Sequence, residues 1–179
     1  MTQEIKSNDG NAEEDGARST HGAQIATEVL RSENDTDRLA ALLRDADEDE
    51  ERIRSMLADP ANAAYAVLDD RGTIAGAALM RWNRDESEII YIAIESGRRG
   101  RGLGKAAIAE ILAEAKRRGV RAVLVGTSNA DLDNVAFYQK CGFRIDSVRP
   151  DYFAYLASPV YANGIRIRDM LVLRYELTG

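Results

Sequence analysis

Residues 95–108 read Glu-Ser-Gly-Arg-Arg-Gly-Arg-Gly-Leu-Gly-Lys-Ala-Ala-Ile, and this stretch decides the fold that we expect. It joins an apolar, strand-like run at 89–94 to an alanine-rich, helix-like run that reaches Arg118. Because glycine lacks a Cβ atom, backbone N–H groups in such a turn can approach an anion closely. The start of the following helix adds a partial positive charge. The stretch therefore predicts a phosphate-binding loop between a strand and a helix.

Two well-known nucleotide loops can be tested by their spacing. A P-loop is excluded, because Arg99 and Ala106 stand where it requires a glycine and a Ser or Thr. The strict dinucleotide fingerprint Gly-x-Gly-x-x-Gly fails as well, with Lys105 at the third glycine position in one register. In the other register Ala107 fills that position, which only the relaxed form admits, and residues 122–126 lack the acidic partner. The relaxed dinucleotide loop stays open as an alternative.

Size and composition narrow the class of protein. A chain of 179 residues suits a single domain with its own core. It has neither an apolar run near the roughly 20 residues that span a membrane nor a signal segment, and its single cysteine agrees with a reducing cytoplasm. One histidine makes a His/Cys metal site untenable, and a net charge of −6 argues against nucleic acid as a partner.

The pattern along the chain predicts one α+β domain after a tail. Residues 1–23 are polar and acidic, so we expect a disordered acidic tail, followed by a single domain over 24–179. The element order is βααβββαβαββ, and the acidic run at 45–51 is expected to be solvated at a helix start. The expected strands cover 25–30, 64–68, 73–80, 88–94, 121–125, 143–148 and 168–175.

Two motifs, one helix, one strand and one loop apart, carry a family resemblance. The first is Arg99-x-x-Gly102-x-Gly104, and the second is Phe137-Tyr138-x-x-x-Gly142-Phe143. Together they resemble the GNAT superfamily of acyl-CoA N-acyltransferases, and the resemblance covers residues 24–175. Segments such as 126–129 and 138–145 resemble a bacterial subgroup, some of whose members are labelled aminoglycoside-type. The resemblance implies a mostly antiparallel sheet of about seven strands that splays at the CoA site and is flanked by about four helices.

The resemblance also implies which residues hold acetyl-CoA. Main-chain groups of the strand would contact the pantetheine and the thioester, and the loop would cradle the pyrophosphate. The position at which many members carry asparagine is occupied by Asp131, with two asparagines nearby as candidate contacts. The candidate CoA-binding residues are Ile92, Ala93, Ile94, Arg99, Gly100, Arg101, Gly102, Leu103, Gly104, Lys105, Asn129 and Asn134.

The implied reaction transfers the acetyl group directly to a primary amine of a small molecule, peptide or protein. Tyr138 would protonate the leaving thiolate, because a phenol stays protonated at neutral pH. Glu88, with Glu95 as second choice, would accept the amine proton, whereas Cys141 is interpreted as a small buried residue. A non-catalytic acyl-CoA sensor is the alternative, and the C-terminal strand could support a homodimer. Tyrosines 152, 155 and 161 and Trp82 are candidates for the acceptor pocket.

Overall fold

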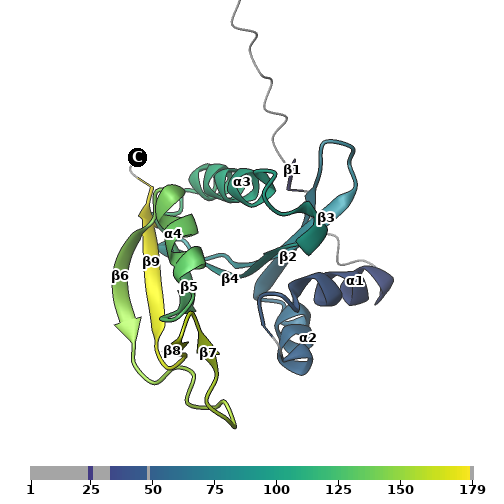
Figure 1. Ribbon diagram of the computed structural model, residues 1–179. Helices are drawn as coiled ribbons and strands as arrows, with labels where there is room; N and C mark the ends of the chain where they lie inside the picture. Colours follow the sequence, from purple (N-terminus) through teal and green to yellow (C-terminus); the bar gives the residue numbers. More distant parts are fainter. Residues whose placement is uncertain (1–23, 26–32, 48, 178–179) are drawn as a thin grey trace, which may run out of the picture.

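The computed structural model describes residues 24–25, 33–47 and 49–177 (Figure 1). The predicted tail at 1–23 and most of the first predicted strand lie outside the described residues. Seven strands form one sheet in the order β1-β2-β3-β4-β5-β9-β6, and β7 and β8 form a separate ribbon. Every neighbouring pair in the main sheet is antiparallel except β4 and β5. The prediction of a mostly antiparallel sheet of about seven strands is confirmed.

The elements have the following bounds. The strands are β1 (Gln24–Ile25), β2 (Asn62–Leu68), β3 (Ile74–Arg81), β4 (Glu86–Ile94), β5 (Ala122–Ser128), β6 (Arg144–Arg149), β7 (Tyr161–Ala162), β8 (Ile165–Arg166) and β9 (Met170–Glu176). The helices are α1 (Glu33–Leu43), α2 (Glu50–Ala58), α3 (Leu103–Arg117) and α4 (Leu132–Lys140), with a short 3₁₀ turn η1 (Ser96–Arg98). The described part of the chain thus carries the four α-helices that the sequence predicts.

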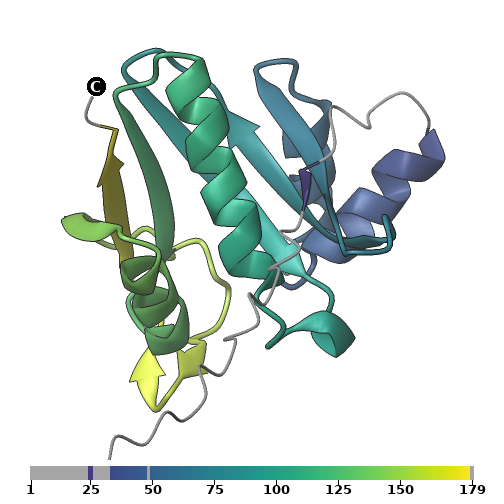
Figure 2. The same cartoon turned by 90° about the horizontal axis from the view of Figure 1, so that it is seen from above.

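Helices cover the two faces of the sheet unequally. On one face, α3 and α4 pack over β3, β4, β5 and β9, with Ile108 and Ile111 of α3 fully buried against Val123. On the other face, α1 and α2 pack over β2, β3 and β4 through residues such as Leu43 and Ile53. Figures 1 and 2 show α3 lying across the sheet where β4 and β5 meet, with α1 and α2 on the far side of β2. Within the described residues, the layer of α1 and α2 therefore leaves β5, β9 and β6 uncovered by a helix.

The central strand β4 changes its side-chain pattern at a β-bulge. Its pairing with β3 steps from Tyr91 to Ile89, so Ile90 is the extra residue. Ile89 packs under α3, whereas Tyr91 and Ala93 belong to the core beneath α1 and α2. A bulge bends a strand and re-aims its side chains. The bulge lies where β4 begins to separate from β5.

Some element bounds differ from the prediction. The strand predicted at 121–125 runs on to Ser128, because its partner β9 pairs with it as far as Met170. The segment 150–165, expected to be irregular, contains β7 and the start of β8, which form a ribbon around the turn at Asn163 and Gly164, both with positive φ. Two such short strands without an alternating apolar pattern give little signal in a sequence.

Candidate active site

The site is centred on a gap in the sheet. The parallel pairing of β4 with β5 ends at Ile89 and Val125, although β4 continues to Ile94 and β5 to Ser128. The Glu95 N–H donates to the Ala75 carbonyl at 2.9 Å. Because backbone groups alternate in direction along an antiparallel strand, those of Ile92 and Ile94 point away from β3, toward the gap. The predicted splay is confirmed.

This alternation separates the three strand residues predicted to contact CoA. Ile92 presents a free main-chain edge toward β5, as a ligand lying in the gap would require, whereas Ile94 offers only its N–H there because its carbonyl accepts from Arg99. The backbone of Ala93 faces β3 instead, and its carbonyl oxygen lies so close to Gly76 that a Cβ there would sit 2.3 Å from it. The main chain of Ala93 therefore pairs within the sheet, and its contact with CoA stays a prediction.

The glycine loop opens directly beyond β4. Gly100 and Gly102 adopt φ values of 74° and 81°, which side chains disfavour, and open space surrounds both α-carbons. Gly102 is the N-cap of α3 and offers no side-chain cap. The first backbone bond of α3 runs from the Ala106 N–H to the Gly102 carbonyl. The N–H groups of residues 103–105 precede that bond and are oriented to receive an anion.

The cationic side chains of the loop have two different environments. Nε of Arg99 donates to the Ile94 carbonyl at 2.9 Å, and its guanidinium pairs with Asp45 at the end of α1. Arg99 thus fixes the loop to β4 rather than offering its full charge to a ligand. Arg101 and Lys105 are exposed. The positive charge available to a phosphate therefore comes mainly from these two residues and the helix start.

Leu103 and Gly104 have packing roles. Leu103 lies against the small core formed around Val67 and Ala107. At Gly104, an added Cβ would lie 3.3 Å from the Phe137 ring, so this glycine lets α3 approach α4 closely. The second glycine of the loop motif therefore brings the helix that carries Tyr138 next to the phosphate loop.

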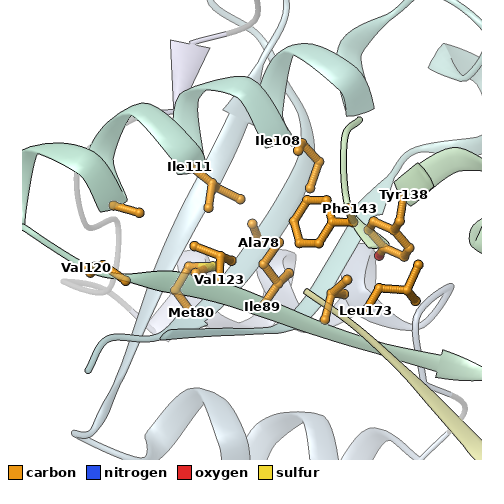
Figure 3. Packing of buried hydrophobic residues seen from close by; sticks show 12 residues of the cluster. Ala78, Met80, Ile89, Ile108, Ile111, Val120, Val123, Tyr138, Phe143 and Leu173 are labelled. Carbon is orange, nitrogen blue, oxygen red and sulfur yellow. The ribbon is translucent and has the colours of Figure 1, made fainter. Parts of the chain in front are cut away.

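Tyr138 lies on α4 and is 6% exposed (Figure 3). Its ring contacts the rings of Phe137 and Phe143 edge-on, with centroids 5.2 and 5.8 Å away. Burial raises the pKa of the Tyr138 phenol, and the Asp131 carboxylate adds to the rise. Within the described residues, the Tyr138 hydroxyl donates to no protein acceptor. Every fully buried side-chain oxygen or nitrogen there has a hydrogen-bond partner, so the Tyr138 hydroxyl must reach accessible space. A protonated phenol that reaches accessible space can serve as a proton donor.

Glu88 lies one residue before the point where the strands separate. Ile89 packs under α3, so Glu88 emerges on the opposite face of β4, which α3 and α4 do not cover. Its side chain is 34% exposed, and Arg149 of β6 lies 3.8 Å from its carboxylate. Glu95, the second candidate, pairs with Arg98 at 2.9 Å beyond the end of β4. The Glu88 carboxylate is therefore partly exposed and lies nearer than that of Glu95 to the point where β4 and β5 separate. It is on the sheet face opposite Tyr138.

The two asparagines have structural contacts. The Asn129 oxygen accepts the N–H groups of Arg168 and Asp169, and its amide donates to the Arg166 carbonyl. Asn129 ties the end of β5 to the 166–169 segment, and its contact with CoA stays a prediction. Asn134 bonds to Asp131 through both its backbone N–H and its side-chain amide, at 3.0 and 2.6 Å. Its remaining amide oxygen is the part that could meet a ligand.

Sequence reasoning missed a polar cluster on the α1/α2 side of the gap. The acidic run 45–51 is not uniformly solvated, because Asp47 accepts a 2.7 Å hydrogen bond from the Tyr91 hydroxyl. Arg52 lies 3.7 Å from Asp47 and donates to the Tyr152 hydroxyl at 3.0 Å. Of the predicted acceptor-side aromatics, Tyr152 and Tyr155 join this cluster. Trp82 does not, since it packs on Tyr65 near α3; Tyr161 is exposed on β7.

Other chemistries have little support in the part of the chain that the structure describes. Three or more His, Cys, Asp or Glu side chains nowhere come together there as a metal site. Burial raises the pKa of the half-buried Cys141 thiol, which opposes a role as nucleophile. No helix among the described residues is long and apolar enough to cross a membrane.

Comparison with known proteins adds a family and solved neighbours. The model of the acetyltransferase (GNAT) family matches residues 27–143. An uncharacterised N-acetyltransferase of Bacillus subtilis is 30% identical over 133 residues, which cover 68% of this chain and 86% of that protein. A GNAT family acetyltransferase from Elizabethkingia anophelis, solved with acetyl-CoA bound, superposes with a TM-score of 0.75 at 26% identity, covering 88% of this chain and 99% of that one.

A second solved structure agrees. A Bacillus subtilis acetyltransferase in complex with CoA superposes with a TM-score of 0.74 at 27% identity, over 88% of this chain and 99% of that one. The family match spans both motifs, and the splayed strands, the open glycine loop and the α4 tyrosine occur together in the fold. The chain belongs to the GNAT acetyltransferase family.

Proposed function

We propose that this protein transfers the acetyl group of acetyl-CoA directly to a primary amine. The observation that carries the proposal is the end of β4–β5 pairing at Ile89, with the free main-chain edge of Ile92 and the Ile94 N–H leading to an uncapped helix start. An extended amide-containing chain can bond to a free strand edge, and a pyrophosphate can bind a helix start. Pantetheine followed by pyrophosphate has this order of groups. The relatives solved with acetyl-CoA or CoA support the assignment.

The chemistry assigned to the residues balances in protons and bonds. The amine nitrogen attacks the thioester carbon, the C–N bond forms and the C–S bond breaks. A main-chain N–H at the gap, that of Ile92 in our proposal, would stabilise the charge that develops on the carbonyl oxygen. Tyr138 would give its proton to the leaving thiolate, and Glu88 would accept the amine proton through water. Glu88 and Tyr138 emerge on opposite faces of the sheet, so the two substrates would enter from opposite sides.

Binding of the donor is the first test. Saturating acetyl-CoA should raise the melting temperature of the protein, because a ligand that binds only the native state stabilises it by mass action. NADH at the same concentration is the control for the dinucleotide alternative. Stabilisation by NADH and not by acetyl-CoA would overturn the donor assignment.

Turnover is the second test. Thiol release from acetyl-CoA, measured across a panel of primary amines that includes aminoglycosides, polyamines, amino acids and N-terminal peptides, should exceed the amine-free rate for at least one class. Mass spectrometry should find one added acetyl group on that amine. Tight binding of acetyl-CoA with amine-independent thiol release throughout the panel would favour the non-catalytic sensor.

A further inference from the structure

The polar cluster on the α1/α2 side of the gap contains a cation whose geometry is fixed from three directions. The Arg52 guanidinium donates through Nη2 to the Tyr152 hydroxyl at 3.0 Å. Its Nε lies 3.7 Å from an Asp47 oxygen, and its carbon lies 5.1 Å from the centroid of the Tyr155 ring. An arginine side chain ordinarily loses rotamer entropy when a ligand fixes it. The contacts of Arg52 restrict its side chain before any ligand binds, so less entropy is lost on binding.

Arg52 keeps hydrogen-bond donors for a ligand. A guanidinium has five N–H groups, and within the described residues its hydrogen bonds go to the Tyr152 and Tyr155 hydroxyls, which leaves further N–H groups over. The side chain is 30% exposed, so its remaining N–H groups reach solvent. A planar, fixed fork with free N–H groups matches a carboxylate, which it can bind through two parallel bonds.

The neighbouring carboxylate does not occupy this fork. Asp47 accepts the Tyr91 hydroxyl at 2.7 Å and the Asp49 N–H at 3.0 Å, so its oxygens are already bonded. Its distance of 3.7 Å from Nε is that of an ion pair without a hydrogen bond. Asp47 therefore orients Arg52 and leaves the Nη edge open.

The position of Arg52 connects it with the acceptor. Tyr91 bonds to Asp47 and is the residue before Ile92, whose backbone faces the gap. Tyr152 and Tyr155 belong to the 150–156 segment that follows β6, the strand that carries Arg149 beside Glu88. Arg52 thus lies on the face from which the amine would approach, set back from β4 by one tyrosine side chain and one carboxylate.

Resting on the proposed function, we infer that the acceptor is an amine that also carries a carboxylate, and that Arg52 binds this carboxylate through its free Nη edge. The acceptor would span the distance from the gap to the α2 start, with its amine at the thioester. Arg52 is then a specificity-determining residue, and Tyr152, Tyr155 and Asp47 position it.

The test compares two probes of equal length that differ only in charge. 5-Aminopentanoate and 5-aminopentanamide are titrated by calorimetry into protein saturated with CoA, which cannot react. We expect the carboxylate to bind at least about tenfold more tightly to the wild type, as a charge-assisted bidentate contact gives. Arg52→Gln should abolish this preference, and Arg52→Lys, which keeps the charge and loses the fork, should retain part of it.

Tyr152→Phe distinguishes the binding of the carboxylate by Arg52 from the positioning of Arg52 by Tyr152. This variant removes the Arg52–Tyr152 bond but keeps the guanidinium, so it should keep most of the preference for the carboxylate. The inference is overturned if the wild type shows no preference, including the case in which neither probe binds. It is also overturned if Arg52→Gln and the wild type prefer the carboxylate equally, or if Tyr152→Phe loses the preference as completely as Arg52→Gln. Failure of the proposed function has a different signature, since no amine of either kind would then be acetylated from acetyl-CoA.

Discussion

The proposed donor half and the proposed acceptor half of this site are built in different ways. The donor half uses backbone groups within a short stretch, from Ile92 on β4 to the start of α3 at Leu103. The acceptor half uses side-chain pairs between remote segments, such as Arg52 with Tyr152, which are 100 positions apart. Backbone recognition depends on glycine spacing and chain direction, whereas side-chain recognition depends on tertiary contacts. The difference explains why a sequence can specify its donor and leave its acceptor open.

The largest expected effect concerns Tyr138, which lies on α4 beside the loop of the donor half. Tyr138→Phe removes the proton donor and leaves the ring contacts with Phe137 and Phe143, so kcat should fall by about 10²- to 10⁴-fold. The affinity for acetyl-CoA, measured by calorimetry, should stay unchanged. Tyr175→Phe, another tyrosine that packs on Phe143, is the matched control and should keep its kcat. Full activity of Tyr138→Phe would assign the proton to another group.

The donor half can be tested through two glycines that differ in one property. Gly97 and Gly102 both have open space around the α-carbon, but only Gly102 has a positive φ. A side chain costs about 1–2 kcal/mol in that conformation, so Gly102→Ala should weaken acetyl-CoA binding by about tenfold. Gly97→Ala should change it little. Equal losses in the two variants, measured by calorimetry, would mean that the φ of the loop is not what the donor requires.

Alkaline pH tests a tyrosine from each half. The pKa of Tyr138 is raised by burial and then by Asp131, and that of Tyr91 by burial and then by its bond to Asp47. Tyrosines of the unfolded chain titrate near pH 10, where these two still keep their protons. As pH rises through about 10, the unfolded state loses protons that the native state keeps, so the free energy of unfolding falls.

Single Phe substitutions should make that fall shallower. Each of Tyr138→Phe and Tyr91→Phe removes at most about 1.4 kcal/mol per pH unit from the slope. Urea unfolding between pH 9 and 11 measures it. Variants with the wild-type slope would show that both phenols ionise in the native state as they do in the unfolded chain.

The same contrast between local backbone features and long-range side-chain contacts explains which residues the sequence could predict. The glycines, the splay and Tyr138 were predictable because each occupies a fixed distance from a strand or helix end. Asp47 was assigned to a solvated acidic run, because only the fold brings Tyr91 and Arg52 to it. Asn129 was assigned to CoA by its nearness to the motif, whereas its bonds with 166–169 come from a segment about 40 positions away. Nearness in sequence does not reveal a long-range contact that uses the same atoms.

Asp45 offers the smallest and most discriminating test, because the α1–α2 connector touches both halves. Asp45 pairs with Arg99 of the donor loop, and Asp47, two residues on, holds Tyr91 and Arg52. Asp45→Asn removes a negative charge beside the anion site and releases the Arg99 guanidinium, which keeps its bond to the Ile94 carbonyl. Because the pair is about half exposed, the gain in acetyl-CoA affinity should be only about two- to threefold and should shrink at high salt. Acceptor affinity, measured with CoA bound, should not change. A loss of acceptor affinity in Asp45→Asn would show that the connector couples the two halves, which would then no longer be independent sites.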